Sequence, residues 1–511
     1  MTASESRRPA EAEPLGQAGE ATRSRTVPTG ANDTVSLRRM PGWFGVLFAT
    51  DTLERFGFYG MQATLVLYAS APVARGGLGL ATGDAAALFG AWISVMFLLS
   101  LPGGWLGDRV LGQRRALLAG CLVSAAGYLC LATPSGGGAV LGLLALAVGG
   151  GLFKPNHQAM INLVFGDRRG RESGISLMYV GVQLSAVAAP LVTGYLGERV
   201  SWNVGFAVCA APMVLTAGLL AVAAGQFRGI GSRASRSLTA VERAKAIRLA
   251  GAVLAVLAVL VLVLWLAGKL SATTAIVAAS VLSFLLPAAG YATLYRNPAL
   301  GSGDRRRLKG YLVVLLGATL FWMIIAHAAS LLNLFARDHT DLTVAGFVVP
   351  ASWLQATTPV FILVLAPLVA AVMPRWGGPH QLAAKFAAGL LLVGGGFLVM
   401  AVAAANTAND VRISPLWLVA VYLMHACGEV VVVAVTVSAA AEVLPRQFMG
   451  RVLGMLWLFA ALGGGLGSVL VRLSEVVPEP AYYAALGGAA ALTGLGFLAG
   501  RRALTRALST T

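Results

Sequence analysis

The segment WFGVLFATDTLERFGFYGMQATLVLY, residues 43–68, is long and apolar enough to cross a membrane, yet it carries three charged side chains. Asp51, Glu54 and Arg55 lie near its middle. A charged group near the bilayer centre costs at least about 2.5–3.5 kcal/mol, so such groups usually pair and mark the path of a substrate or an ion. Residues three and four apart share one face of a helix. The segment therefore predicts a membrane helix with a charged face.

Two more charges, Lys154 and Glu429, interrupt apolar segments further along the chain. Two cations and three carboxylates on three separate segments predict one polar site inside a helical bundle, and a protein that moves something across a membrane. An ion-pair cluster that only holds helices together is the alternative interpretation, and it does not exclude the functional one.

The composition is that of a membrane protein. Of 511 residues, 57% are hydrophobic and only 12% charged, and the mean hydropathy is +0.77. A soluble chain normally has about twice that charged fraction. The net charge of +17 would suggest a nucleic-acid partner in a soluble protein, but here basic residues collect at segment ends and indicate topology instead. The four cysteines lack disulfide or zinc spacing, so no metal and no cofactor is expected.

Apolar stretches of roughly 20 residues, enough to cross a hydrocarbon core about 30 Å thick, recur along the chain. They predict fourteen membrane helices, at 43–69, 83–107, 114–133, 139–164, 174–196, 202–226, 246–267, 273–295, 309–335, 345–373, 381–404, 415–442, 449–472 and 481–500. Basic residues concentrate in alternate loops, so the positive-inside rule places both termini in the cytoplasm of a multi-pass protein of the inner membrane.

Six helices, an inserted pair and six more helices predict two symmetrical bundles. Substrate near the midplane between two six-helix halves is the arrangement of the major facilitator fold, so the fold class is an all-α membrane protein of that type. The expected domains are a disordered cytoplasmic tail at 1–40, bundles at 41–227 and 309–501, a linker with the inserted transmembrane hairpin at 228–308, and a tail at 502–511. The hairpin, residues 246–295, has no ionisable residue except Lys269, so we expect it to face lipid.

The sequence GWLGDRVLGQRR, residues 104–115, resembles the G-x-L-x-D-R-x-x-G-x-R-R loop of major facilitator transporters. Asp108 is expected to cap the positive end of a helix, while Arg109, Arg114 and Arg115 pair with it or face anionic lipid. This loop predicts gating and says nothing about the substrate.

The sequence DTLERFGFYG, residues 51–60, resembles the E-x-x-E-R-F-x-Y-Y-G motif of proton-dependent oligopeptide transporters, with Asp51 in place of the first glutamate. GLFKPN, residues 151–156, is similar to the same sequence on the fourth helix of that family. Further similar segments cover most of the chain, at 171–198, 321–336, 350–355 and 428–429. The chain is identified as a divergent bacterial member of this family.

The resemblance implies a secondary active transporter for small peptides or peptide-like zwitterions, driven by proton symport. Glu429 would face the amino end of the peptide, and Lys154 and Arg55 its carboxylate. Tyr59 and Tyr179 would donate hydrogen bonds to backbone carbonyls. The candidate walls of a side-chain pocket are Trp322, Trp353 and Trp457.

Proton coupling is expected from Asp51, Glu54 and Glu429. Without substrate, Lys154 would pair with Glu54 or Glu429, and protonation of the carboxylate would free the lysine. His327 is a further candidate, since an ordinary histidine titrates near physiological pH, although a lone histidine on an apolar helix is more often a packing residue.

The chain departs from the family where the peptide would be held. Gln62 stands in place of an arginine and Ala326 in place of a glutamate, and the resemblance implies that these two partners form a salt bridge at the outer gate. Replacement of both charged partners by neutral residues is physically reasonable, because replacing one alone would leave a buried charge unpaired, at a cost of about 3–5 kcal/mol. Gln183 and Thr358 replace asparagines and Phe97 a tyrosine, which weakens the peptide assignment.

Two alternatives stay open: an exporter of a peptide-like natural product or drug by proton antiport in the same fold, and a substrate sensor without transport. A membrane-embedded enzyme is not expected, since the sequence has no HExxH, GxSxG or P-loop pattern. The expected partners are a peptide or other small molecule, protons and the lipid bilayer, and we expect the protein to function as a monomer.

Overall fold

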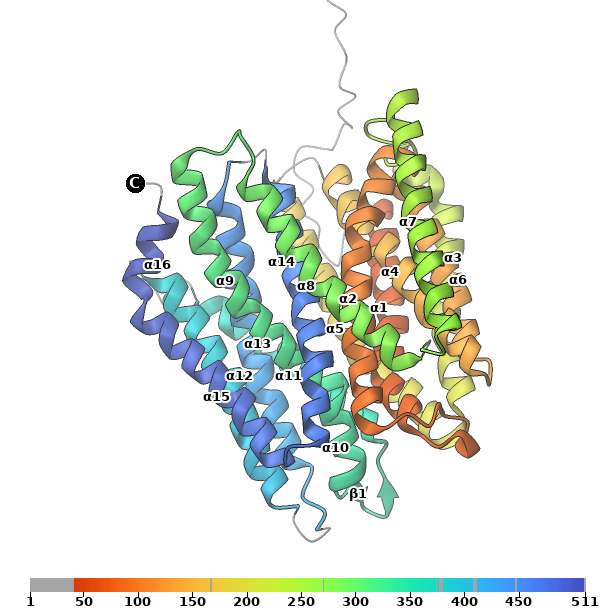
Figure 1. Cartoon of the computed structure of the whole chain (residues 1–511), viewed down its shortest axis with the longest axis vertical. Helices are drawn as coiled ribbons and strands as arrows, with labels where there is room; N and C mark the ends of the chain where they lie inside the picture. Colours follow the sequence, from red (N-terminus) through yellow and green to blue (C-terminus); the bar gives the residue numbers. More distant parts are fainter. Residues whose placement is uncertain are drawn as a thin grey trace, which may run out of the picture.

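The computed structural model describes residues 41–165, 168–269, 271–373, 375, 380–407, 411–445 and 448–509. The predicted tail at residues 1–40 lies outside these ranges. The chain forms a bundle of long helices that run roughly along one axis (Figure 1). The short strands β1 (Thr343–Val344) and β2 (Phe347–Val348) form an antiparallel pair at one end, here called the β end. The C-terminus lies at the opposite end, here called the tail end (Figure 1).

The first half of the bundle has six long helices joined by short loops. They are α1 (Gly42–Ser70), α2 (Thr82–Leu106), α3 (Gln113–Leu131), α4 (Gly136–Val164), α5 (Arg168–Tyr195) and α6 (Trp202–Val222). Shorter helical turns follow several of them: η1 (Val73–Arg75), η2 (Gly107–Leu111), η3 (Leu196–Val200) and η4 (Ala223–Phe227). Serine side chains begin two of the long helices, because Ser135 and Ser201 each accept a hydrogen bond from a backbone N–H of the first turn.

The inserted pair and the second half follow. Their long helices are α7 (Ala240–Leu266), α8 (Ala272–Tyr295), α9 (Ser302–Ala326), α11 (Thr357–Val372), α12 (Gln381–Ala405), α13 (Leu416–Val443), α14 (Met449–Leu470) and α15 (Glu479–Ala499). The shorter ones are η5 (His327–Ala329), α10 (Leu331–His339), η6 (Ala351–Ala356), η9 (Val471–Glu475) and α16 (Arg501–Leu508).

Within the described residues, thirteen spans are long and apolar enough to cross a membrane. α1 is the fourteenth long helix, with 29 residues, and it is interrupted by the charges of Asp51, Glu54 and Arg55. It packs along α5 and α6 like its neighbours. The predicted all-α architecture with fourteen membrane helices is therefore confirmed.

Glycines bring some helix pairs into backbone contact. Gly394 on α12 and Gly487 on α15 face each other, and a Cβ added to either would lie 2.8 Å from the carbonyl oxygen of the other. Close approach of this kind is how membrane helices gain van der Waals contact, since water-driven burial does not act between helices in lipid.

The inserted pair differs from the expected lipid-facing hairpin in its second helix. Every residue of α7 is described and none is buried, but α8 packs between α2 and α14 and so contacts both halves (Figure 1). Ser280 and Ser283 of α8 are buried, and the Ser280 hydroxyl lies 2.7 Å from that of Ser468 on α14. Small polar residues in an otherwise apolar segment allow this contact. The lipid-facing expectation rested on the absence of charged residues, which does not distinguish lipid from a neighbouring helix.

Candidate functional site

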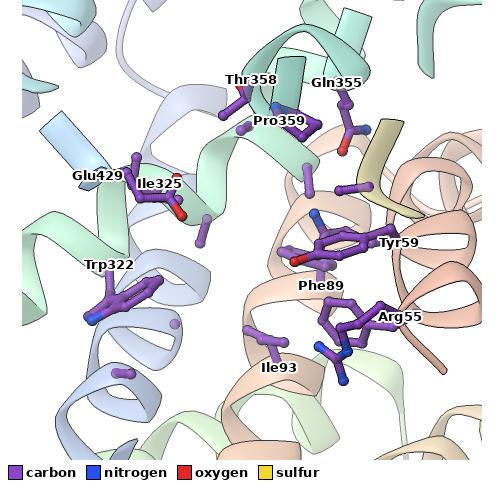
Figure 2. Close-up of a pocket in the computed structure, with 18 of the residues that line it drawn as sticks. Arg55, Tyr59, Phe89, Ile93, Trp322, Ile325, Gln355, Thr358, Pro359 and Glu429 are labelled. Carbon is purple, nitrogen blue, oxygen red and sulfur yellow. The ribbon is translucent and has the colours of Figure 1, made fainter. Parts of the chain in front are cut away.

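A cavity of about 260 Å³ lies between the two halves, slightly below the range of roughly 300–1,000 Å³ typical of small-molecule sites. Helices α1, α2, α4 and α5 of the first half and α9, α11, α13 and α14 of the second half line it. The predicted site residues found in its wall are Arg55, Tyr59, Lys154, Gln183, Trp322, Thr358, Glu429 and Trp457. Figure 2 shows Glu429 and Trp322 on one side, facing Arg55 and Tyr59 on the other.

The guanidinium of Arg55 is held by the carboxylate of its neighbour Glu54. Arg55 Nε and Nη2 donate hydrogen bonds of 2.5 and 2.6 Å to the two oxygens of Glu54, and both residues are buried. The Arg55 guanidinium carbon also lies 4.4 Å from the centroid of the Phe58 ring. The two charges neutralise each other, so Arg55 is already paired before any ligand binds.

Lys154 differs from expectation, because it pairs with neither Glu54 nor Glu429. Its ammonium lies 5.3 Å from the centroid of the Trp457 ring, within range of a cation–π interaction. Glu54 is occupied by Arg55, which explains why the expected pair does not form. In the described part of the chain, Lys154 has no ion-pair partner.

Glu429 reaches the cavity from α13 in the second half (Figure 2). Among the described residues it forms no ion pair. Tyr422, seven residues earlier and so on the same face of α13, also lines the cavity. Its buried hydroxyl has no hydrogen-bond partner within the described residues, so a bound ligand is a suitable partner. We did not predict Tyr422 from the sequence, although its seven-residue spacing from Glu429 was visible there.

Several positions that depart from the family line the cavity on helices of both halves. Gln62 and Ala326 both line the cavity, with Gln355 and Thr358 close by in the same wall. The Gln355 amide donates a long hydrogen bond of 3.4 Å to the carbonyl of Ala63. These four side chains are uncharged, unlike Lys154 and Glu429 in the same wall.

Five residues predicted to bind substrate or protons lie outside the cavity wall: Tyr179, Trp353, His327, Asp51 and Glu54. Trp353 donates a hydrogen bond of 2.9 Å from Nε1 to the carbonyl of Leu191, so its indole joins two helical segments. Tyr179 is 43% exposed and hydrogen-bonds to Gln183, through which it can influence the cavity. His327 is buried behind α9, where Nδ1 donates to the Met323 carbonyl at 2.8 Å and Nε2 lies 2.7 Å from the Tyr482 hydroxyl.

Asp51 also lies behind the cavity wall. Its carboxylate approaches His157, a histidine of α4 that we did not single out in the sequence, with 3.8 Å between Asp51 Oδ1 and His157 Nδ1. Asp51, Glu54 and Arg55 are thus close together as predicted, but each carboxylate has a different partner.

The glycine-rich loop at residues 104–115 is tied to the linker that leads to α7. The Asp108 carboxylate accepts a hydrogen bond of 2.6 Å from the Gln113 side chain, so pairing with an arginine, one of the two expected roles for the arginines, is not seen among the described residues. Arg109 forms a salt bridge of 3.0 Å with Glu242 of α7, and Arg114 donates to the carbonyl of Ala224 at 3.2 Å. Arg115 is exposed.

At the β end, Glu198 joins the two halves. Its carboxylate accepts hydrogen bonds from the backbone N–H groups of Ala351 and Ser352, at 2.9 and 3.1 Å, and from the Ser352 hydroxyl at 2.5 Å. A salt bridge of 2.8 Å between Asp84 and Arg472 adds a second link at this end. These contacts hold the two halves together at the β end, and we did not predict them from the sequence.

Two six-helix halves around a charged cavity define the class of the protein: it is a multi-pass membrane transporter of the major facilitator type. The model of the POT family matches residues 114–485, and the chain belongs to this family.

Relatives agree with this assignment. The peptide transporter YePEPT of Yersinia enterocolitica is 31% identical over 451 residues, which cover 83% of this chain and 86% of the relative. Dipeptide and tripeptide permease A of Escherichia coli is 26% identical over 454 residues, 88% of this chain and 87% of the relative. An uncharacterized transporter of Bacillus subtilis, YclF, is 29% identical over 455 residues, 87% of this chain and 92% of the relative.

Solved structures share the fold. A crystal structure of the peptide transporter POT in complex with sulfate has a TM-score of 0.87 and 30% identity, covering 93% of this chain and 97% of that one. A POT family transporter in complex with 5-aminolevulinic acid also has a TM-score of 0.87, with 25% identity over 92% of this chain and 98% of that one.

Proposed function

We propose that the protein moves small peptides or peptide-like zwitterions across the cytoplasmic membrane by proton symport. The observation that carries this proposal is the pair of opposite charges in the cavity, Lys154 on α4 and Glu429 on α13, neither of which has an ion-pair partner among the described residues. A small zwitterion satisfies both: its carboxylate binds the ammonium, and its amino group binds the carboxylate.

The relatives support this substrate class. YePEPT is named as a peptide transporter, and the E. coli relative as a permease for dipeptides and tripeptides. A solved relative binds 5-aminolevulinic acid, a small amino acid, and another binds sulfate, an anion. A cavity that holds amino and acid groups is consistent with each of these.

Alternating access follows from the location of the two charges on different halves. A zwitterion bound between Lys154 and Glu429 would link the halves at mid-height, while the contacts of Glu198 hold them together at the β end. If the halves close around the substrate at mid-height, the Glu198 contacts would be strained and would break, and the β end would open. We propose the bundles at 41–227 and 309–501 as the moving units, with a linker at 228–308 and a monomer as the functional unit.

We place both termini, and so the tail end, in the cytoplasm of an inner-membrane protein, because basic residues concentrate in alternate loops. In this orientation the β end is the outer gate, and Gln62, Ala326 and Gln355 lie on its side of the binding site.

An exporter that works by proton antiport is the second candidate. The neutral groups at Gln62 and Ala326 favour it, because they remove the charges that the resemblance assigns to the gate, and Thr358 favours it because it replaces an asparagine that the resemblance assigns to the grip on a peptide. Export needs the same fold and the same charged pair, but proton entry is then coupled to exit of the substrate.

Transport by the purified protein in proteoliposomes distinguishes these functions. With symport, a labelled dipeptide accumulates inside when the outside is made acidic, and a protonophore abolishes the accumulation. With antiport, the same acidic outside drives preloaded dipeptide out of the vesicles and no accumulation occurs. Absence of dipeptide counterflow under all conditions would contradict the proposed substrate class.

A further inference from the structure

His157 lies one turn after Lys154 on α4 and packs against α1. Its imidazole is 5% exposed and stacks on the Phe153 ring, with 5.4 Å between the ring centroids. Nε2 lies 3.0 Å from the carbonyl oxygen of Leu47, and Nδ1 lies 3.8 Å from Oδ1 of Asp51. Both ring nitrogens therefore face an oxygen atom of α1.

The Leu47 carbonyl determines which nitrogen carries a hydrogen. A carbonyl oxygen only accepts hydrogen bonds, so Nε2 must be the donor in this contact. Nδ1 is then a bare lone pair in neutral histidine, and it faces a carboxylate that is also an acceptor when ionised. At 3.8 Å the two acceptors face each other without a hydrogen bond, and one more proton would allow them to pair. That proton makes either an imidazolium beside a carboxylate or an imidazole beside a carboxylic acid.

We propose that Asp51 and His157 form a proton-binding site that couples the proton to the substrate. The inference rests on the proposed function and adds to it a residue, His157, and a place for the proton. The site needs no carboxylate at position 326, where this chain has an alanine. His327 does not have this arrangement, because both of its nitrogens meet neutral partners, the Met323 carbonyl and the Tyr482 hydroxyl.

The charges around the pair explain how the proton would act on the substrate. The titratable and charged groups near this region are Glu54, Arg55 and Tyr59 on α1, Lys154 on α4, and Cys121 and Tyr128 on α3. Asp51, Glu54 and Arg55 are all within electrostatic range of the Lys154 ammonium. With His157 neutral, the two carboxylates balance the two cations, and the cluster has no net charge.

Binding one proton leaves the cluster with one positive charge in excess. A net charge in a buried region is unfavourable, so the proton-loaded cluster favours an anion at its exposed cation. That cation is Lys154, which lines the cavity. The carboxylate of the substrate restores neutrality, so proton and substrate each promote binding of the other, which is the requirement for symport.

The first test separates coupling from transport. In His157→Gln the amide N–H can replace Nε2 and keep the bond to Leu47, while the titrating nitrogen is lost; Asp51→Asn removes the other member of the pair. We expect both variants to catalyse dipeptide counterflow but to lose accumulation driven by an imposed pH gradient. His327→Gln, the same change at another buried histidine, should keep accumulation. Wild-type accumulation in His157→Gln, or loss of counterflow together with accumulation, would overturn the assignment.

The second test does not depend on transport. Nitrogen-15 NMR of histidine-labelled protein reports protonation of each ring nitrogen, and the His157→Gln spectrum identifies the signals of His157 among the five histidines. As the pH is lowered, we expect the Nδ1 signal of His157 to change when the pair takes up its proton, while Nε2 keeps its hydrogen, and we expect Asp51→Asn to alter this change. An Nδ1 signal that does not change with pH, or a change that Asp51→Asn leaves unaffected, would refute the site. If this test succeeds but no dipeptide counterflow occurs, the proposed substrate is wrong and the proton site stands.

Discussion

The two halves of the bundle treat their buried polar groups in different ways. In the first half, charged groups are gathered and held: Arg55 by Glu54, and Asp51 beside His157. In the second half, His327 hydrogen-bonds to neutral groups, and its ring packs 5.5 Å from that of Phe397. Glu429 is the one predicted charged site residue that the second half, in its described part, contributes to the cavity wall. The difference indicates that the first half sets the electrostatics of the site, while the second half supplies one counter-charge and aromatic walls.

Lys154→Ala should have the largest effect, because it removes the exposed cation of the charged half. A substrate carboxylate left unpaired in a buried site costs about 3–5 kcal/mol, so we expect roughly a 100-fold or greater loss of dipeptide affinity, with folded protein still in the membrane. Binding to detergent-purified protein measures this loss. Lys154→Arg is the matched control and should retain part of the affinity. Near-normal affinity in Lys154→Ala would show that the first half does not bind the carboxylate.

Glu429→Gln should have the next largest effect, since it removes the counter-charge of the second half but keeps a hydrogen-bond acceptor. Hydrogen bonds to charged groups contribute about 1.5–3 kcal/mol, so we expect affinity to fall about tenfold or more. A substrate analogue that lacks the amino group should lose much less affinity than a dipeptide does. Equal losses for both compounds would place the amino group elsewhere. Cys427→Ala, two residues away on α13, is the control.

Ala326→Glu would make the second half more like the first, because it adds a carboxylate at a neutral position of the cavity wall. The cavity gives this group some water, so the cost should be below the roughly 3–5 kcal/mol of a fully buried unpaired charge. We expect a lower melting temperature and slower transport than in wild type. Adding Gln62→Arg on α1 should recover part of both, because the new charges then pair. If the double variant is worse than Ala326→Glu alone, these positions do not face each other.

His327→Phe should have the smallest effect on transport. The variant loses two hydrogen bonds to neutral groups and leaves the Tyr482 hydroxyl without its partner, so a loss of stability of about 1–3 kcal/mol is expected, visible in the melting temperature. The pH dependence of dipeptide uptake should stay the same. A shifted pH profile would move proton binding into the second half.

Much of the fold follows from the sequence, because length and apolar composition decide which segments span a membrane. The fourteen helices and the three charges on α1 were predictable for that reason. The contact of α8 with both halves was not, because it depends on serines that an apolar segment also tolerates at a lipid-facing position.

The residues of the cavity wall were largely predictable, but their pairing was not. Helical spacing brings residues three or four apart together, and adjacent residues are not expected to face each other. Glu54 and Arg55 are adjacent, yet they bond side by side at the edge of α1. That pair in turn determines that Lys154 stays free to face Trp457. The side-chain rotamers of these residues determine which charges pair. A pattern of residue types along the sequence does not specify rotamers.

The bond between Glu198 and the β end has a consequence for how the protein can change by mutation. Two of its three donors are backbone N–H groups, at Ala351 and Ser352. Substitution of a side chain in that segment leaves those donors in place, with proline as the exception. Substitution of Glu198 therefore removes the whole link, whereas substitution of Ser352 removes only the hydroxyl bond and leaves the two backbone bonds. A salt bridge between two side chains, such as Asp84–Arg472, is lost when either residue changes. Side-chain substitutions in the second half, proline apart, therefore leave two of the three bonds to Glu198 in place. The side chains around η6 can change to suit new ligands while the halves stay joined at the β end.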